Sequence, residues 1–186
     1  LALALDDSYL PIQGPPGSGK TYTGAKIILD LVRPAAGKPR VVGVTAFSHA
    51  AIGNLLREVV KHAGEGSDLR IIQKADDGDW CGLAEVERVD NKAAEARLAA
   101  DTVDIVAGTP WLWSRPGLDG AIDTLVVDEA GQISLANLAA IGRAARNLVL
   151  LGDPQQLSQP VKGAHPPGAE RSALEHVLGE HEAIPP

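Results

Sequence analysis

The sequence predicts one α/β domain, with a mostly parallel sheet and helices on both faces. Short apolar segments rich in β-branched residues alternate with segments of helical periodicity, a pattern typical of parallel strands joined by crossover helices. A glycine-rich loop joins the first predicted strand to the first predicted helix. At 186 residues, the chain is long enough for a single hydrophobic core, and it contains no internal repeat.

The glycine-rich loop occupies residues 14–21 and reads GPPGSGKT. It satisfies the pattern G-x-x-x-x-G-K-[ST], in which backbone N–H groups surround phosphate oxygens. Lys20 would then reach the β- and γ-phosphates, and the Thr21 hydroxyl would bind Mg²⁺. The predicted nucleotide-binding residues lie in the loop or directly after it: Gly14, Pro15, Gly17, Ser18, Gly19, Lys20, Thr21 and Tyr22. The alternative is a chance match in an ordinary turn, which the strand–loop–helix context disfavours.

The other elements are predicted from periodicity and turn signals. The predicted strands are apolar runs bounded by turn residues: Tyr9–Gln13, 40–45, 69–73, 103–107, 122–128 and 147–151. The predicted helices are residues 22–32, 90–100, 135–145 and 170–178. A further helix begins after Ser48, which caps it, and ends at residues 64–67. Residues 74–88 have weak periodicity, which predicts irregular structure, and we expect residues 74–102 to form a small insertion in the domain.

Composition excludes several classes of protein. There is no apolar run long enough to span a membrane, and the apolar start of the chain lacks the basic flank of a signal peptide. The single cysteine, Cys81, is typical of a reducing cytoplasmic compartment. The net charge of −7 argues against a uniformly basic surface, although it allows a local basic groove. Because the chain has no methionine and begins within a pattern, we expect it to be a fragment.

A pair of carboxylates, Asp128 and Glu129, ends the strand predicted over residues 122–128. Parallel strands bring their carboxyl ends to the crevice where such sheets bind ligands. Asp128 could hold Mg²⁺ there, and Glu129 could orient and deprotonate the water that attacks the γ-phosphate. The alternative is an acidic pair that only complements a helix dipole. The phosphate loop upstream favours the metal and base roles.

A third polar motif follows the strand predicted over residues 147–151 and reads GDPQQ. Its second glutamine, Gln156, could sense the γ-phosphate through a hydrogen bond without adding charge. Taken in order, GPPGSGKT, VVDEAGQIS and LVLLGDPQQL resemble motifs I, II and III of superfamily 1 helicases. The likeness is greatest to the Upf1-like and Dna2-like branch, some of whose members are fused to RecB-like nucleases. It extends over residues 9–160.

This resemblance implies a RecA-like first motor domain of the P-loop NTPase type, which binds ATP and Mg²⁺ and moves on single-stranded DNA or RNA. By motif position, Lys20, Glu129 and Gln156 match catalytic residues of the family. Thr21 and Asp128 match its metal ligands. Two further stretches resemble strand-contacting motifs of the family and supply the predicted nucleic-acid contacts: Thr45, Ser48, His49, Asn54 and Thr109.

The family also requires a second RecA-like domain of the same chain, whose arginines assist phosphoryl transfer. The resemblance therefore implies that this fragment binds nucleotide but hydrolyses it slowly or not at all, and a fused nuclease domain is a further expected partner. Trp111 and Trp113 flank the second strand-contacting stretch. They could stack on bases or pack against the sheet or a neighbouring domain.

Two other functions stay open from the sequence. One is a regulatory or assembly ATPase that uses the same core without moving on a strand. The other is a small-molecule kinase, which adjacent carboxylates at the end of a strand disfavour because they suit activation of water better than transfer to an alcohol.

Overall fold

A seven-stranded sheet forms the centre of the molecule, and every neighbouring pair of its strands is parallel. The structure is a computed structural model, and it describes residues 1–153 and 171–179. The strands lie across the sheet in the order β1-β7-β6-β2-β5-β3-β4. Their bounds are β1 Tyr9–Gln13, β2 Val42–Thr45, β3 Ile71–Lys74, β4 Val86–Val89, β5 Ile105–Ala107, β6 Ile122–Val127 and β7 Ala145–Gly152.

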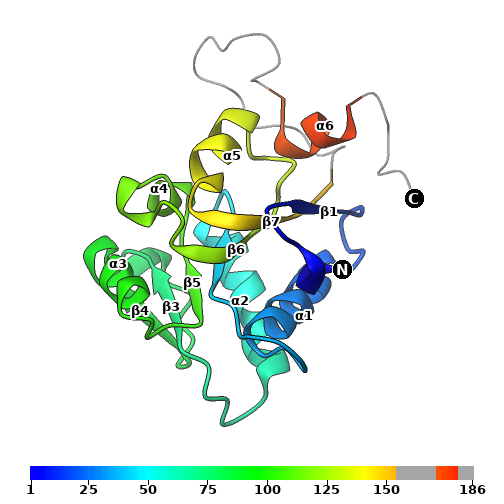
Figure 1. Cartoon of the computed structure of the whole chain (residues 1–186). Helices are drawn as coiled ribbons and strands as arrows, with labels where there is room; N and C mark the ends of the chain where they lie inside the picture. The colour runs from blue at the N-terminus through cyan, green and yellow to red at the C-terminus, as the bar shows by residue number, and fades with distance from the viewer. Residues whose placement is uncertain (154–170, 180–186) are drawn as a thin grey trace.

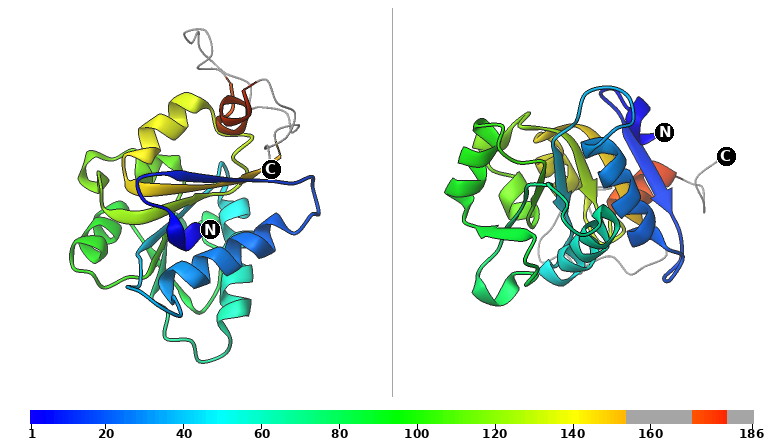
Figure 2. Two further views of the ribbon diagram at one scale, coloured as in Figure 1. Left: turned by 45° about the vertical axis from the view of Figure 1, so that its right-hand side comes forward. Right: turned by 90° about the horizontal axis from the view of Figure 1, so that it is seen from below.

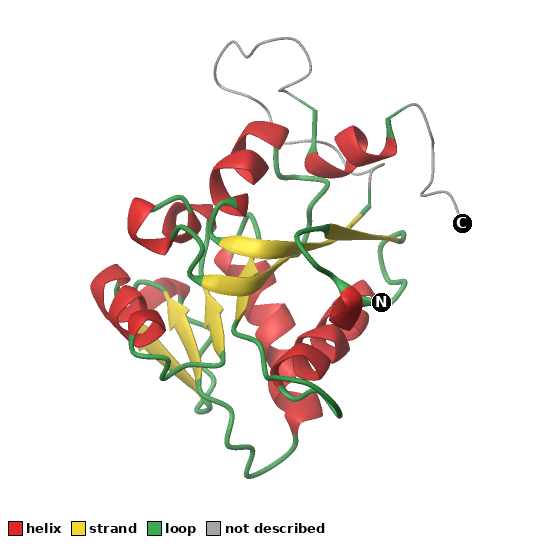
Figure 3. Cartoon of the chain, in the orientation of Figure 1, coloured by secondary structure: helices red, strands yellow, loops and turns green. Residues whose placement is uncertain are grey.

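Helices cover both faces of the sheet, as Figure 1 and the two turned views of Figure 2 show. Helices α1 (Lys20–Val32) and α2 (His49–Ala63) lie against each other on one face. The other face carries α3 (Asn91–Ala99), α4 (Pro110–Trp113), α5 (Leu135–Gly142) and α6 (Ala173–Leu178). Three short 3-10 turns, Ala2–Ala4, Asp77–Asp79 and Pro116–Leu118, complete the regular elements of the described residues. The layers are therefore helix, sheet and helix (Figure 3).

Side chains of the central strands alternate between two apolar cores. In β6, Val126 packs into the core beneath α1 and α2, whereas Leu125 and Val127 pack into the core beneath α3, α4 and α5. Because both faces of the sheet are covered, these strands need apolar residues at consecutive positions. This requirement explains the unbroken apolar runs of the sequence.

Side-chain caps fix where several helices begin. The Ser48 hydroxyl accepts a hydrogen bond from the backbone N–H of Ala51 at 3.1 Å, as the sequence predicts. Ser134 caps α5 in the same way, and Asp90 caps α3. Helix α1 differs, because its N-cap is Gly19 and no side chain caps it. Its first N–H groups face the phosphate loop instead.

The predicted fold class is confirmed, and the sheet is wholly rather than mostly parallel. The strand Tyr9–Gln13 has the predicted bounds. Helix α1 begins two residues earlier than predicted because Lys20 and Thr21 belong to its first turn. Helix α5 ends at Gly142, three residues before the predicted end, because the chain is already entering β7 at Ala145.

One prediction of irregular structure is wrong. Residues 86–88 fall in the segment predicted to lack regular structure, but they belong to β4, which pairs with β3 at the edge of the sheet. Only Val86 and Val89 of this strand are buried, and the charged residues between them are exposed. A four-residue edge strand with two polar positions has too few apolar residues to give a period of two. That residues 74–102 form an insertion stays a prediction.

The strand order decides where the polar motifs meet. Strand β7 lies between β1 and β6, so the loops that leave the carboxyl ends of these three strands are neighbours. The phosphate loop follows β1, and the acidic pair follows β6. Among the described residues, no helix combines the length and the apolar character that crossing a bilayer requires.

Candidate active site

The phosphate loop leaves β1 and turns tightly into α1. Gly17 and Gly19 have φ angles of +77° and +84°, a conformation that glycine adopts without strain. Gly14 is buried, and a Cβ atom at this position would lie 2.4 Å from the Ser18 hydroxyl oxygen. Residues 15–19 are exposed. The backbone conformation thus favours glycine at Gly17 and Gly19, whereas at Gly14 the close neighbour is the Ser18 side chain. The loop presents its curved surface to solvent.

Lys20 holds its ammonium group over this loop. Its Nζ donates hydrogen bonds to the carbonyl oxygens of Gly14 and Pro15, the second at 2.8 Å. The charge therefore lies beside the uncapped N-terminus of α1, where backbone N–H groups and the helix dipole also favour an anion. Thr21, the next residue of the first turn, is partly exposed.

Tyr22 turns away from the loop towards α2. Its ring meets the His62 ring edge-on, with 4.9 Å between the ring centroids, and Lys26 Nζ lies 5.8 Å from its centroid. The side chain is half-exposed. The predicted contact of Tyr22 with nucleotide stays a prediction, and in this structure its ring packs between helices.

The end of β7 joins the phosphate loop to the acidic loop. The carbonyl of Gly152 accepts a hydrogen bond from the N–H of Gly14 at 3.1 Å. A Cβ atom on Gly152 would lie 2.9 Å from the backbone nitrogen of Gly131, and one on Gly131 would lie 2.4 Å from the carbonyl oxygen of Asp153. These approaches leave room only for glycine. The backbones that follow β1, β6 and β7 therefore pack directly on one another.

Asp128 and Glu129 lie in the turn after β6. The N–H of Asp128 donates to the carbonyl of Thr45 at 2.8 Å, and that of Ala130 donates to the carbonyl of Leu151 at 2.8 Å. Glu129 has a φ angle of +54°, a strained value for a residue with a side chain. Its N–H donates to the carboxylate of Asp128 at 2.9 Å. Strained residues of this kind persist where neighbouring contacts hold them in place, and they cluster at functional sites.

Burial raises the pKa of both carboxyl groups. For Asp128, burial outweighs the hydrogen bond from the Glu129 N–H and the nearby positive charge of Lys20, both of which lower its pKa. For Glu129, burial comes first, and the negative charge of Asp128 raises its pKa further. A raised pKa makes Glu129 a stronger base, and an additional cation near Asp128 would favour the ionised forms of both.

These residues fit Mg²⁺ and a nucleoside triphosphate. Mg²⁺ is usually held by one or two carboxylates together with substrate phosphates and water. Asp128 is a buried carboxylate next to the charge of Lys20, and Thr21 can add a hydroxyl ligand. No cluster of three or more His, Cys, Asp and Glu side chains that could hold a metal occurs in residues 1–153 and 171–179. The remaining ligands would have to come from phosphate and water.

The residues predicted to contact nucleic acid have different environments. Thr45 is completely buried at the end of β2 and its hydroxyl lacks a hydrogen-bond partner within the described residues, so the structure does not place this side chain at a surface. The Ser48 hydroxyl is engaged in capping α2. Asn54 is exposed, and its side-chain oxygen accepts from Arg57 at 2.5 Å. Gln156, predicted to sense the γ-phosphate, lies outside the described residues.

His49 and Thr109 come together at a cavity of about 710 Å³ beside the ends of β2 and β5. Its lining includes two exposed aromatic side chains, Phe47 at 44% and Trp111 at 85% exposure. Lys74 contributes an ammonium group from the end of β3, 3.8 Å from the carboxylate of Asp76. Phe47 and Lys74 are not among the predicted contacts. The available signal is their place in the sequence: Phe47 lies two residues after the strand predicted over residues 40–45, and Lys74 directly follows the strand predicted over residues 69–73.

The two tryptophans have opposite environments. Trp111 is exposed and lines the cavity, whereas Trp113 is 1% exposed and belongs to the apolar core. The packing alternative therefore applies to Trp113, and Trp111 is the one available for stacking.

Comparison with known proteins agrees with this geometry. The AAA domain family matches residues 2–168. The chain belongs to this family. The resemblance to superfamily 1 helicases is confirmed, and this AAA domain is RecA-like and of the Upf1-like type. Membership implies nucleotide binding.

Relatives of this AAA domain include two helicases. The DNA replication ATP-dependent helicase/nuclease dna2 of Schizosaccharomyces pombe is 27% identical over 165 residues, which cover 85% of this chain and 11% of that protein. The ATP-dependent helicase NAM7 of Saccharomyces cerevisiae is 27% identical over 199 residues, which cover 90% of this chain and 20% of that protein. The AAA domain thus spans a tenth to a fifth of the length of these relatives.

Solved structures share the fold. The arterivirus nonstructural protein 10 helicase in complex with DNA matches 86% of this chain and 32% of its own, with a TM-score of 0.52 and 21% identity. The Type ISP restriction-modification enzyme LlaGI, in a nuclease-deletion mutant bound to a DNA substrate mimic, matches 86% of this chain and 17% of its own, with a TM-score of 0.52 and 15% identity.

The raised pKa values of Asp128 and Glu129 predict a pH dependence of stability. Between the usual carboxyl pKa values, about 4, and the higher values in the folded state, the folded chain binds more protons than the unfolded chain. The two carboxyl groups therefore favour the folded state less as pH rises through that window, and the free energy of unfolding decreases. The double variant Asp128→Asn/Glu129→Gln lacks this contribution.

Urea denaturation at several pH values measures the effect. We expect the stability of the double variant, relative to the unmodified chain, to increase with pH through the window and then level off, because all other titrating groups are shared. A difference independent of pH would show that the two carboxyl groups titrate as they do in the unfolded chain.

Proposed function

We propose that this chain is the ATP-binding motor domain of a superfamily 1 helicase. One observation carries the proposal. The phosphate loop and the acidic pair meet on either side of β7, although more than a hundred residues separate them in the sequence. A glycine loop, a lysine and two buried carboxylates at one edge of a parallel sheet suit Mg–ATP and its hydrolysis.

In this proposal the phosphate loop binds the phosphates of ATP. The N–H groups at the start of α1 contact phosphate oxygens, and Lys20 exchanges its bonds to the Gly14 and Pro15 carbonyls for bonds to the β- and γ-phosphates. Thr21 and Asp128 would hold Mg²⁺, which when bound neutralises charge on the β- and γ-phosphate oxygens.

Glu129 acts as the general base. Its raised pKa and its strained position beside Asp128 suit a carboxylate that orients a water molecule and accepts its proton as the water attacks the γ-phosphorus. The bond to the β–γ bridging oxygen breaks, and ADP and phosphate leave. Arginines from a second RecA-like domain of the parent protein would stabilise the transferring phosphoryl group, so this chain alone hydrolyses ATP slowly.

Single-stranded nucleic acid is the proposed track, and the cavity between His49 and Thr109 is its proposed contact surface. Lys74 offers a positive charge, Thr109 and Ser114 offer hydroxyl groups, and Trp111 offers an exposed ring. Positive charge, polar groups and aromatic platforms are the usual means of holding single strands without reading sequence. The DNA-bound structures of two proteins that share the fold agree with this proposal.

A fused nuclease in the parent protein is a further proposal, for which the helicase/nuclease relative is the support. The second candidate function is a regulatory ATPase that does not move on a strand. Binding of single-stranded nucleic acid at the cavity is expected for the motor domain and not for the regulatory ATPase.

Nucleotide binding by the chain tests the first part of the proposal. Lys20→Ala should weaken binding of a fluorescent ATP analogue in the presence of Mg²⁺ by roughly 10- to 100-fold, because a charged hydrogen-bond donor to phosphate is lost. Lys38→Ala is the matched control, since Lys38 is an exposed lysine far from the loop in sequence and should bind like the unmodified chain. Glu129→Gln should keep binding and lose the remaining hydrolysis. Equal affinity of Lys20→Ala and the unmodified chain would contradict the proposed site.

Strand binding tests the second part. Trp111→Ala should weaken binding of a fluorescein-labelled oligothymidylate by roughly 5- to 150-fold, since stacking on one base is worth about 1–3 kcal/mol. Trp80→Ala is the control, because Trp80 is also an exposed tryptophan but lines a different cavity, beside β4. Fluorescence anisotropy gives both affinities. If the two variants bind equally well, the cavity is not the contact surface.

A further inference from the structure

A buried tryptophan joins the two chain segments that line the proposed strand-binding cavity. Trp113 is 1% exposed. Its indole Nε1–H donates to two backbone carbonyls, that of Gly108 at 3.2 Å and that of Val44 at 3.4 Å. The N–H of Gly108 also donates to the carbonyl of Val44 at 3.0 Å. One side chain thus bridges the carboxyl ends of β5 and β2.

The ring of Trp113 lies directly on β2. A Cβ atom at Gly43 would be 2.8 Å from Trp113 Cη2, so the absence of a side chain at Gly43 lets the indole approach the strand closely. Leu112 and Leu118 belong to the same apolar core. Burial explains why an apolar ring occupies this place. It does not explain why the N–H points at two strand ends, because a phenyl ring would fill an apolar space without a donor.

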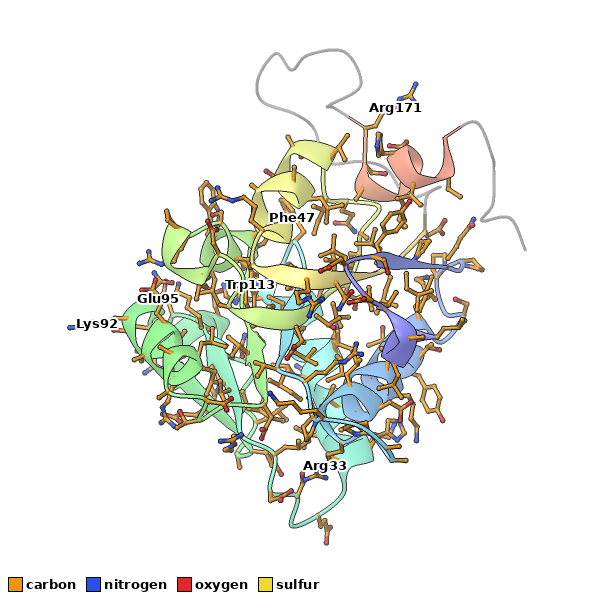
Figure 4. The ribbon with its side chains drawn as sticks, viewed as in Figure 1. Arg33, Phe47, Lys92, Glu95, Trp113 and Arg171 are labelled. Atoms are coloured by element: carbon orange, nitrogen blue, oxygen red, sulfur yellow. The ribbon has the colours of Figure 1, made fainter. Side chains whose placement is uncertain are left out.

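The chain segments that follow the two bridged carbonyls line the cavity. Residues 45–49 follow Val44 and carry Phe47 and His49 to its lining. Residues 109–111 follow Gly108 and carry Thr109 and Trp111 to the opposite part of the lining. Figure 4 labels Phe47 and Trp113, of which the first is exposed at the surface and the second is buried in the core.

The next carbonyl along β2 accepts a hydrogen bond from the acidic loop. Thr45 accepts the N–H of Asp128 at 2.8 Å, directly after Val44 accepts the indole N–H. Successive carbonyls of β2 are therefore held by the acidic loop and by Trp113. The end of β2 has a fixed partner on each side, and the cavity-lining residues start from it.

We propose that Trp113 is a positioning residue for strand binding: its N–H fixes the ends of β2 and β5 relative to each other and so aligns Phe47 and His49 with Thr109 and Trp111. The inference rests on the proposed function, because it assigns Trp113 a role at the same cavity. Trp113 itself does not contact the strand.

Trp113→Phe removes the donor and keeps an aromatic ring in the core. We expect it to weaken oligothymidylate binding by about two- to tenfold, because strand binding must then restore an alignment that one buried hydrogen bond no longer holds, and to leave binding of the fluorescent ATP analogue unchanged. Leu118→Ala, which truncates a side chain of the same core, is the control for general destabilisation and should bind the oligonucleotide normally while it remains folded.

Replacement of the Trp113 indole by its benzothiophene analogue covers the case in which Trp113→Phe fails to fold, since this analogue has the same shape with sulfur in place of N–H. It should show the same selective loss of strand affinity. Normal oligonucleotide binding by the benzothiophene form, together with weakened binding by Trp111→Ala, would overturn the role of Trp113 and leave the proposed function intact. If Trp111→Ala also binds normally, or the unmodified chain does not bind the oligonucleotide, the proposed function fails and this inference fails with it.

Discussion

The position of β7 between β1 and β6 is the constraint on which the rest of the site depends. Because β7 ends in Gly152, the backbone of the phosphate loop can bond to it from one side while the turn after β6 packs on it from the other. A side chain at Gly152 or Gly131 would push these loops apart. The distance between Lys20 and the carboxylates is therefore set by a backbone contact rather than by flexible side chains, which suits a site that must be preorganised for phosphate and metal.

Strand β2 extends this arrangement towards the other half of the sheet. Its last residue bonds to the acidic loop, and the residue before it bonds to Trp113 and to the end of β5. The nucleotide site and the aromatic cavity thus share one strand end. In the proposed motor, a change in the acidic loop on loss of the γ-phosphate would act on the strand end from which the cavity-lining residues start.

The sequence alone predicts the parts of this protein that depend on local pattern. The phosphate loop, the Ser48 cap and the apolar strands follow from residue type and spacing, and the acidic pair follows from its place at a strand end. The strand order does not, because it depends on packing between distant segments. For the same reason the sequence could not separate Trp111 from Trp113, which differ only in the side of a short helix that they occupy. It also missed β4, whose edge position allows polar residues.

Amide NMR of the isotope-labelled chain with Mn²⁺–ATP tests the central claim most directly, because the paramagnetic ion broadens signals of nearby residues. The account predicts that the amides of Gly14, residues 17–21, residues 128–131 and Gly152 lose intensity first and together, while β3, β4 and α3 keep theirs. Broadening of the phosphate loop without the acidic loop, or broadening centred elsewhere, would contradict a single nucleotide site built around the end of β7.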